Sequence, residues 1–295
     1  MDRQRVYNTE GVILRRRNLG EADSIFTVFT EREGKFDAVA RGVRKARSRM
    51  RGHLEPMTRT RMLLARGRSL DVFTQAETVS AYRALREDME RTAEALYCLE
   101  LVDRFTVEHS ETPGLYDLLV AILESLDAGA PAHIVRFFEL HLLSLTGYEV
   151  HLDACAGCGA RLPAEDAMLS PQAGGLVCYS CRGTAGAGRL VSVRAIKVLR
   201  FAGQGGLAAF AAVRVDEHLA AELQSAMAEV VRYQLERDPV TNRYLADVAR
   251  LPPKATHANS PSPAQSGAGE PEPIEWPDNS PSPVLPGKEE RGLGG

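Results

Sequence analysis

Residues 155–181 read CAGCGARLPAEDAMLSPQAGGLVCYSC, and the cysteines in this stretch decide one part of the fold. They form two C-x2-C pairs, Cys155 with Cys158 and Cys178 with Cys181, separated by nineteen residues. Each pair places two thiolates on one tight turn, and the segment between them is long enough for a hairpin that returns the second turn to the first. Four thiolates complete the tetrahedral shell of a structural zinc ion and leave no position for water or substrate. We therefore expect a zinc ribbon that organises structure.

Disulfide bonds between these cysteines are the alternative reading of the same spacing. Disulfides need an oxidising compartment, whereas the N-terminus, MDRQRVYNTEG, lacks the apolar core of a signal peptide. No run approaches the roughly 18 to 20 apolar residues that cross a bilayer. We therefore expect a cytoplasmic protein with a metal-bound ribbon. The fifth cysteine, Cys98, lies in the apolar helical pattern LYCLELV and is expected to be buried.

The N-terminal region predicts a small β-barrel. β-Branched and aromatic residues alternate in short runs that turn signals separate, such as EGK at Glu33–Lys35. Five strands in about 75 residues, with one long loop, suit an OB-fold, although an SH3-like barrel would give nearly the same pattern. We expect this barrel to occupy residues 1–80. The strands are predicted at 12–14, 24–30, 36–40, near 54–65 and at 70–78.

Beyond residue 80 the apolar period changes to three and four residues, which is typical of amphipathic helices. We expect an α-helical domain at 81–252, with the zinc ribbon inserted at about 151–190, and hence an α+β multidomain protein. Residues 253–295 are dense in Pro, Ser, Gly and Glu and predict a disordered tail. The helices are predicted at 82–106, 113–129, 134–147, 192–203, 216–237 and 241–250.

Charge is unevenly distributed along the chain. The formal net charge is −3, yet residues 1–80 contain 17 Lys and Arg against 10 Asp and Glu, which is +7. The remainder contains 19 against 29, which is −10. This asymmetry favours a nucleic-acid surface on the barrel and a different role for the helical domain.

The segment RGVRKARSRMR, residues 41–51, is the strongest candidate for that surface. Six of its eleven residues are Lys or Arg and none is acidic. Cations that neutralise phosphates release condensed counterions, so such a loop can hold nucleic acid without reading its sequence. A solvated loop without a partner is the alternative, but ten cations with a single acid across 41–68 favour nucleic acid. The candidate DNA-binding residues are Arg41, Arg44, Lys45, Arg47, Arg49, Arg51, Arg59 and Arg61.

Aromatic stacking and catalysis are less well supported by the sequence. An exposed strand phenylalanine among Phe26, Phe29, Phe36 and Phe73 can stack on a base, but strand phenylalanines are more often core residues. Glu21 and Asp23 share a turn without a partner base, and we find no catalytic constellation. We therefore do not expect an enzyme.

Taken together, these features resemble the bacterial recombination mediator family RecO, in its zinc-containing form. The resemblance covers roughly residues 5–250, and the linked order of barrel, basic loop and ribbon is more specific than any one part. It is carried by NLGEAD at 18–23, EGK at 33–35, ARGVRKARSR at 40–49, LEP at 54–56, Gly67-Arg68 and the four-cysteine ribbon with Gly174-Gly175.

The resemblance implies a non-catalytic DNA repair and recombination protein, associated with the nucleoid. Members of the family bind single- and double-stranded DNA, anneal complementary strands and work with RecR. They also engage the acidic C-terminal tail of single-stranded DNA-binding protein and help to load RecA. By this resemblance the tail would bind an apolar groove on the helical domain, for which Arg104 and Arg136 are candidate rim residues. An RNA-binding or transcription factor with the same barrel and ribbon is the alternative.

Overall fold

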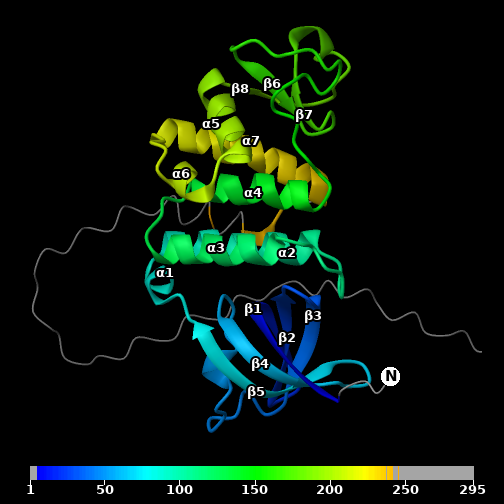
Figure 1. Cartoon of the computed structure of the whole chain (residues 1–295), viewed down its shortest axis with the longest axis vertical. Helices are drawn as coiled ribbons and strands as arrows, with labels where there is room; N and C mark the ends of the chain where they lie inside the picture. The colour runs from blue at the N-terminus through cyan, green and yellow to red at the C-terminus, as the bar shows by residue number, and fades with distance from the viewer. Residues whose placement is uncertain (1–4, 237, 242–244, 246–295) are drawn as a thin grey trace, which may run out of the picture. The chain divides into compact units, whose positions relative to one another are not determined.

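Five strands of the N-terminal region close into a barrel, in the neighbour order β1-β2-β3-β5-β4 (Figure 1). We describe them from a computed structural model that covers residues 5–236, 238–241 and 245. The β3–β5 pairing is parallel and every other pairing in the barrel is antiparallel. This arrangement confirms the predicted OB-fold barrel. The strands are β1 (Val6–Leu19), β2 (Asp23–Thr30), β3 (Gly34–Ala40), β4 (Arg59–Ala65) and β5 (Asp71–Ser80).

The fourth strand begins later than the sequence predicts. Residues ahead of it form a short 3-10 turn, η1 (Arg51–His53), and Met57 has a left-handed φ of 69°. A strand cannot continue through that backbone conformation. The basic loop and the turn that follows it therefore occupy the whole interval between β3 and β4.

The barrel strands β1 and β2 contribute to two hydrophobic clusters, because parts of both strands are buried on both faces. Ile13 and Phe26 point into the barrel interior, while Val12, Leu14 and Phe29 belong to the cluster that contains the helices. Successive side chains on a strand point to opposite faces, so one strand can serve both clusters. The described residues accordingly lie in a single compact unit.

The helical region begins directly after β5. Figure 1 shows α2, α3 and α4 lying side by side, with α5 and α7 beyond α4. The third helix begins at Leu115 and not at residues 112–113, because Gly114 has φ 81° and cannot belong to a right-handed helix. The helices are α1 (Arg83–Glu87), α2 (Met89–Phe105), α3 (Leu115–Asp127), α4 (Ile134–Leu145), α5 (Val193–Gln204), α6 (Leu207–Ala211) and α7 (Glu217–Leu235).

The ribbon is inserted between α4 and α5, as the sequence predicts. Its three short strands form a sheet in the order β7-β6-β8. Leu169, Leu176 and Val191 are at most 1% exposed and belong to the same core cluster as the helices, so the ribbon packs on the helical region. The strands are β6 (Ala167–Ser170), β7 (Gly175–Val177) and β8 (Arg189–Val191), and a 3-10 turn, η2 (Tyr179–Cys181), carries the last cysteine.

Two predictions fall outside the described part of the chain. Of the helix predicted at 241–250, the structure describes only residues 241 and 245. The predicted tail, 253–295, lies wholly outside the described residues. Among the helices that are described, none combines the length and the apolar character that crossing a membrane requires.

Candidate nucleic-acid interface and metal centre

The basic loop, residues 41–51, runs from the end of β3 to the first residue of η1 and presents its cations to solvent. All six of its Lys and Arg side chains are exposed, and none has a carboxylate partner among the described residues. An unpaired cation in water can meet a phosphate without first breaking an ion pair. The loop is therefore a patch of available positive charge, and its members are Arg41, Arg44, Lys45, Arg47, Arg49 and Arg51.

Apolar residues hold this loop at both ends. Val43 is 2% exposed and Leu54 is fully buried, and both belong to the core cluster inside the barrel. Near Leu54, the Nδ1 atom of His53 lies 3.2 Å from the backbone nitrogen of Thr78, which donates to it. Both ends of the loop are therefore anchored in the core of the barrel.

The first turn of the loop is bound to the β1–β2 turn by hydrogen bonds. The backbone N–H of Gly42 donates to Asp23 Oδ1 at 2.7 Å. The backbone N–H of Arg44 donates to the carbonyl of Ala22 at 2.9 Å, and its guanidinium donates to the carbonyl of Gly20 at 3.0 Å. The two turns therefore form one rigid corner of the barrel.

Arg59 and Arg61 of β4 lie in a different electrostatic setting. Both reach Glu10 on the adjacent β1, with Arg59 Nε 2.7 Å and an Arg61 guanidinium nitrogen 3.4 Å from its carboxylate oxygens. Arg59 also reaches Glu124 of α3 at 3.2 Å. The two arginines do share a face, as their spacing predicts, but they carry less available charge than the loop does.

The barrel phenylalanines are not available for stacking. Phe26, Phe29, Phe36 and Phe73 are at most 3% exposed, and Phe26 packs edge-on against Phe73 with ring centroids 5.8 Å apart. A base cannot reach a ring in that position. Contact between this barrel and a nucleic acid would therefore depend on phosphates, not on these four rings.

The four ribbon cysteines converge on one point. Their Sγ atoms all lie within 4.8 Å of one another, and the Cys158 and Cys178 sulfurs are 3.8 Å apart. Gly157 sits at the first turn, where a Cβ atom would lie 3.3 Å from the sulfur of Cys181. The glycine therefore allows the turn to approach the sulfurs closely, and the cluster can hold a metal ion.

Backbone N–H groups favour a thiolate in this cluster. The N–H of Cys178 donates to the sulfur of Cys155 at 3.3 Å and lowers the pKa of the Cys155 thiol to about 6. Hydrogen bonds with the other three sulfurs, the one with Cys178 first, raise the pKa of the Cys181 thiol to about 12. A thiolate is the form in which cysteine binds a metal ion, so the hydrogen bond to Cys155 favours the protonation state that a metal site requires.

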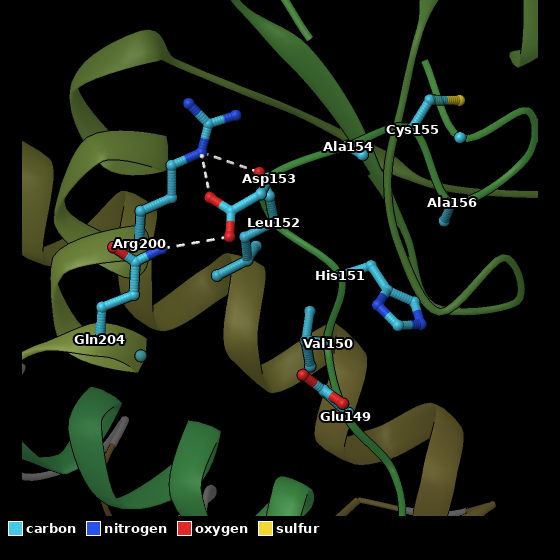
Figure 2. A pocket seen from close by; sticks show the side chains of 12 residues that line it. Glu149, Val150, His151, Leu152, Asp153, Ala154, Cys155, Ala156, Arg200 and Gln204 are labelled. Atoms are coloured by element: carbon cyan, nitrogen blue, oxygen red, sulfur yellow. Dashed lines mark hydrogen bonds and ion pairs between the residues drawn. The ribbon is translucent and has the colours of Figure 1, made fainter. Parts of the chain in front are cut away.

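A cavity of about 450 Å³ lies between the ribbon and α5, and Figure 2 shows the side chains that line it. Among its polar side chains, those of Asp153, Arg200 and Gln204 contact one another or the nearby backbone. Arg200 donates to the carbonyl of Leu152 at 2.8 Å and pairs with Asp153 at 3.6 Å, and Gln204 donates to Asp153 at 3.1 Å. These contacts attach the ribbon to α5, and they do not form a pair of side chains suited to acid–base catalysis.

Comparison with known proteins identifies the family. A family model described as Recombination protein O N terminal matches residues 1–82, and one described as Recombination protein O C terminal matches residues 86–243. The chain belongs to the RecO family. It is 39% identical over 250 residues to the DNA repair protein RecO of Roseiflexus sp. (strain RS-1), covering 84% of this chain and 88% of the relative.

Other relatives carry the same description. The DNA repair protein RecO of Dehalococcoides mccartyi is 33% identical over 245 residues, and that of Desulforudis audaxviator is 36% identical over 239. These matches cover 83% and 81% of this chain, and 96% of each relative. The resemblance drawn from the sequence is confirmed, and this chain is a RecO family DNA repair protein.

Arg104 and Arg136, the residues predicted to line the rim of a groove on the helical domain, are both paired with carboxylates and largely buried. Arg136 is 5% exposed and its Nε lies 3.1 Å from the fully buried carboxylate of Glu139, so it does not line a surface groove in this RecO family protein. Arg104 pairs with Glu100 at 2.7 Å and its side chain is 12% exposed. The prediction is therefore wrong for Arg136. The sequence pattern does not show that Arg136 is buried, because an arginine in a buried ion pair and an arginine on the surface are the same residue in the sequence.

Sequence reasoning also missed how the basic loop is held. Asp23 was assigned no partner, yet it accepts a hydrogen bond from Gly42, nineteen residues away. The ring and the carbonyl of His53 likewise accept hydrogen bonds from β5 and β4, respectively. The available signal was the position of Asp23 at the end of a turn, where Asp commonly accepts backbone N–H groups.

Proposed function

We propose that this RecO family protein binds single- and double-stranded DNA through its basic loop and anneals complementary strands. The observation that carries the proposal is the set of six exposed loop cations that have no carboxylate partner in the part of the chain that the structure describes. Phosphates are the ligand that such a patch attracts, and phosphate contacts carry no sequence information. A surface that neutralises the phosphates of two strands lowers their mutual repulsion while the bases pair.

The contributions of the candidate residues differ in this proposal. Arg41, Arg44, Lys45, Arg47, Arg49 and Arg51 supply the main phosphate contacts, because their charges are free. Arg61, whose side chain is 60% exposed, extends the surface onto β4. Arg59 contributes least, since two carboxylates already occupy its guanidinium group.

We also propose that Cys155, Cys158, Cys178 and Cys181 hold one structural zinc ion. Four sulfurs at about 2.3 Å from a tetrahedral centre lie about 3.8 Å apart, and the Cys158–Cys178 separation of 3.8 Å supports this assignment. With all four positions filled by protein, the ion would fix the two turns and take no part in chemistry. We accordingly propose that the protein is not an enzyme.

Family membership supports a place for this chain in recombinational repair at the nucleoid. In this proposal it acts with RecR and with the C-terminal tail of single-stranded DNA-binding protein, and so helps to load RecA. The tail of that protein would bind the helical region, at residues other than Arg136. Such a partner contact distinguishes a mediator from a protein that only binds DNA.

Strand annealing tests this proposal directly. Complementary single strands, bare or coated with the cognate single-stranded DNA-binding protein, are mixed with the full chain at low and at moderate salt. We expect salt-sensitive annealing that persists on coated strands. Folded protein that does not anneal bare strands would refute the annealing role, and tighter binding to RNA than to DNA would favour an RNA-binding function.

A further inference from the structure

An acidic residue, Asp23, lies at the start of the basic loop, although a negative charge at this position would repel the phosphates of DNA. Asp23 opens β2 and accepts a 2.7 Å hydrogen bond from the backbone N–H of Gly42, the second residue of the loop. Gly42 has φ +65°, a left-handed conformation that turns the chain out of β3. The carboxylate of Asp23 thus holds Gly42, the residue at which the chain turns out of β3 into the loop.

The neighbouring acid in the same turn makes no such contact. Glu21 is exposed, and the described residues provide it with no hydrogen-bond or ion-pair partner. Glu21 and Asp23 lie two residues apart, so they exert comparable long-range repulsion on a DNA strand at the loop. Asp23 is less exposed than Glu21, and of the two only Asp23 accepts a hydrogen bond from Gly42.

We propose that Asp23 is a positioning residue for DNA binding, which acts by holding the Gly42 N–H and so fixing the direction in which the loop presents Arg44 and Lys45. This inference rests on the proposed DNA-binding function. Arg44 is directed further by its own bonds to the carbonyls of Ala22 and Gly20 in the same turn. At the other end, the bond between Thr78 and His53 holds η1 against β5.

Preorganisation gives the physical reason. A loop that is already ordered loses little conformational freedom when it meets a phosphate backbone, whereas a mobile loop must be ordered at the moment of binding. Six cations on a mobile loop would also meet fewer phosphates at one time. The carboxylate therefore increases affinity for a polyanion although it carries the same sign of charge.

The proposal and simple electrostatics predict opposite effects for the same substitution. Removing a negative charge about 10 Å from a phosphate strengthens binding by about twofold on Coulomb energy alone. Loss of a hydrogen bond to an ionised acceptor has a larger effect, so we expect Asp23→Ala to weaken DNA binding roughly five- to tenfold. Glu21→Ala, which removes charge alone, should strengthen binding by about twofold.

The experiment measures the affinity of the full chain for a fluorescent single-stranded oligonucleotide across a salt series, in four forms. These are the wild type, Asp23→Ala, Glu21→Ala and Asp23→Asn. The asparagine carbonyl still accepts from Gly42 without the charge, so Asp23→Asn should bind at least as tightly as the wild type. We expect Asp23→Ala alone to flatten the salt dependence.

A combined variant separates positioning from a general loss of stability. When Arg44, Lys45 and Arg47 are already alanine, the added Asp23→Ala change should have less than about a twofold further effect, because positioned cations are no longer present. A defect in folding would lower affinity to the same extent in both backgrounds. If Asp23→Ala does not fold, Gly42→Ala strains the left-handed backbone from the other side and should weaken binding without changing any charge.

Asp23→Ala binding as tightly as Glu21→Ala would overturn the proposal, as would Asp23→Asn binding as weakly as Asp23→Ala. The proposed DNA-binding function would survive either result, provided that the wild type binds DNA in a salt-dependent manner and the variant without Arg44, Lys45 and Arg47 binds it more weakly. If the wild type itself shows no salt-dependent DNA binding, the proposed function fails, and the inference about Asp23 fails with it.

Discussion

Replacement of three loop cations tests where this RecO family protein contacts DNA. The variant Arg44→Ala, Lys45→Ala, Arg47→Ala removes half of the six unpaired charges of the loop. All three side chains are exposed, and the one side-chain hydrogen bond that the change deletes joins Arg44 to the carbonyl of Gly20. We therefore expect the melting temperature to remain close to that of the wild type.

The size of the effect follows from counterion release. Each phosphate contact on a single strand contributes about 0.7 to the slope of log affinity against log salt, so six contacts give a slope of about −4 and three give about −2. Between 50 and 200 mM salt, the wild type would lose affinity about 300-fold and the variant about 20-fold. The difference lies well outside the error of a binding titration.

Fluorescence anisotropy with a labelled oligonucleotide measures both slopes. A matched control removes three exposed cations outside the barrel that have no carboxylate partner among the described residues, Arg161, Lys197 and Arg214, and so changes the net charge equally. We expect the control to keep the slope of the wild type. A loop variant with an unchanged slope would refute the reasoning, and a control with a flattened slope would move the interface to the ribbon and the helical region.

Three further changes test other parts of the structure. Cys178→Ser removes one of four converging sulfurs, so we expect loss of bound zinc and a lower melting temperature; unchanged zinc content by elemental analysis would contradict a structural metal. Glu94 has one carboxylate oxygen that is sealed from solvent without a hydrogen-bond partner, and burial raises its pKa from 4.5 to about 7. Because the folded state holds this proton more tightly than the unfolded state, the free energy of unfolding should fall as pH rises from about 4.5 to 7, by up to about 3 kcal/mol. Glu94→Gln should remove that fall and be the more stable form at pH 8 in urea titrations; parallel pH profiles for both proteins would contradict the assignment. The sequence of the tail, acidic at Glu270–Asp278, suggests that it competes for the basic loop. Deletion of 254–295 should then tighten DNA binding, and equal affinities would exclude that role.

Local patterns predicted the elements of this fold well. Alternation of β-branched and aromatic residues placed the barrel strands, because burial on a pleated sheet repeats every two residues. Gly129 and Gly147 follow α3 and α4 with φ of 93° and 88°, as the sequence predicted for helix ends. The cysteine spacing predicted the ribbon, because four sulfurs can surround one ion only if the chain between the two pairs folds back and brings the second turn to the first.

The sequence alone determined the fold class, the family and the position of the basic loop, because these follow from local residue patterns and from their order along the chain. The tertiary structure decided which charges remain free. Arg61 lies opposite Glu10 only through the register of β1 with β4, and Arg136 is buried beside Glu139 only because the helices pack on that face. The bond between Asp23 and Gly42 likewise follows from the register of β2 with β3, in which Ser24 lies opposite Ala40. Ion pairs and single hydrogen bonds act over a few ångströms, so they depend on how distant segments pack, which no local pattern specifies.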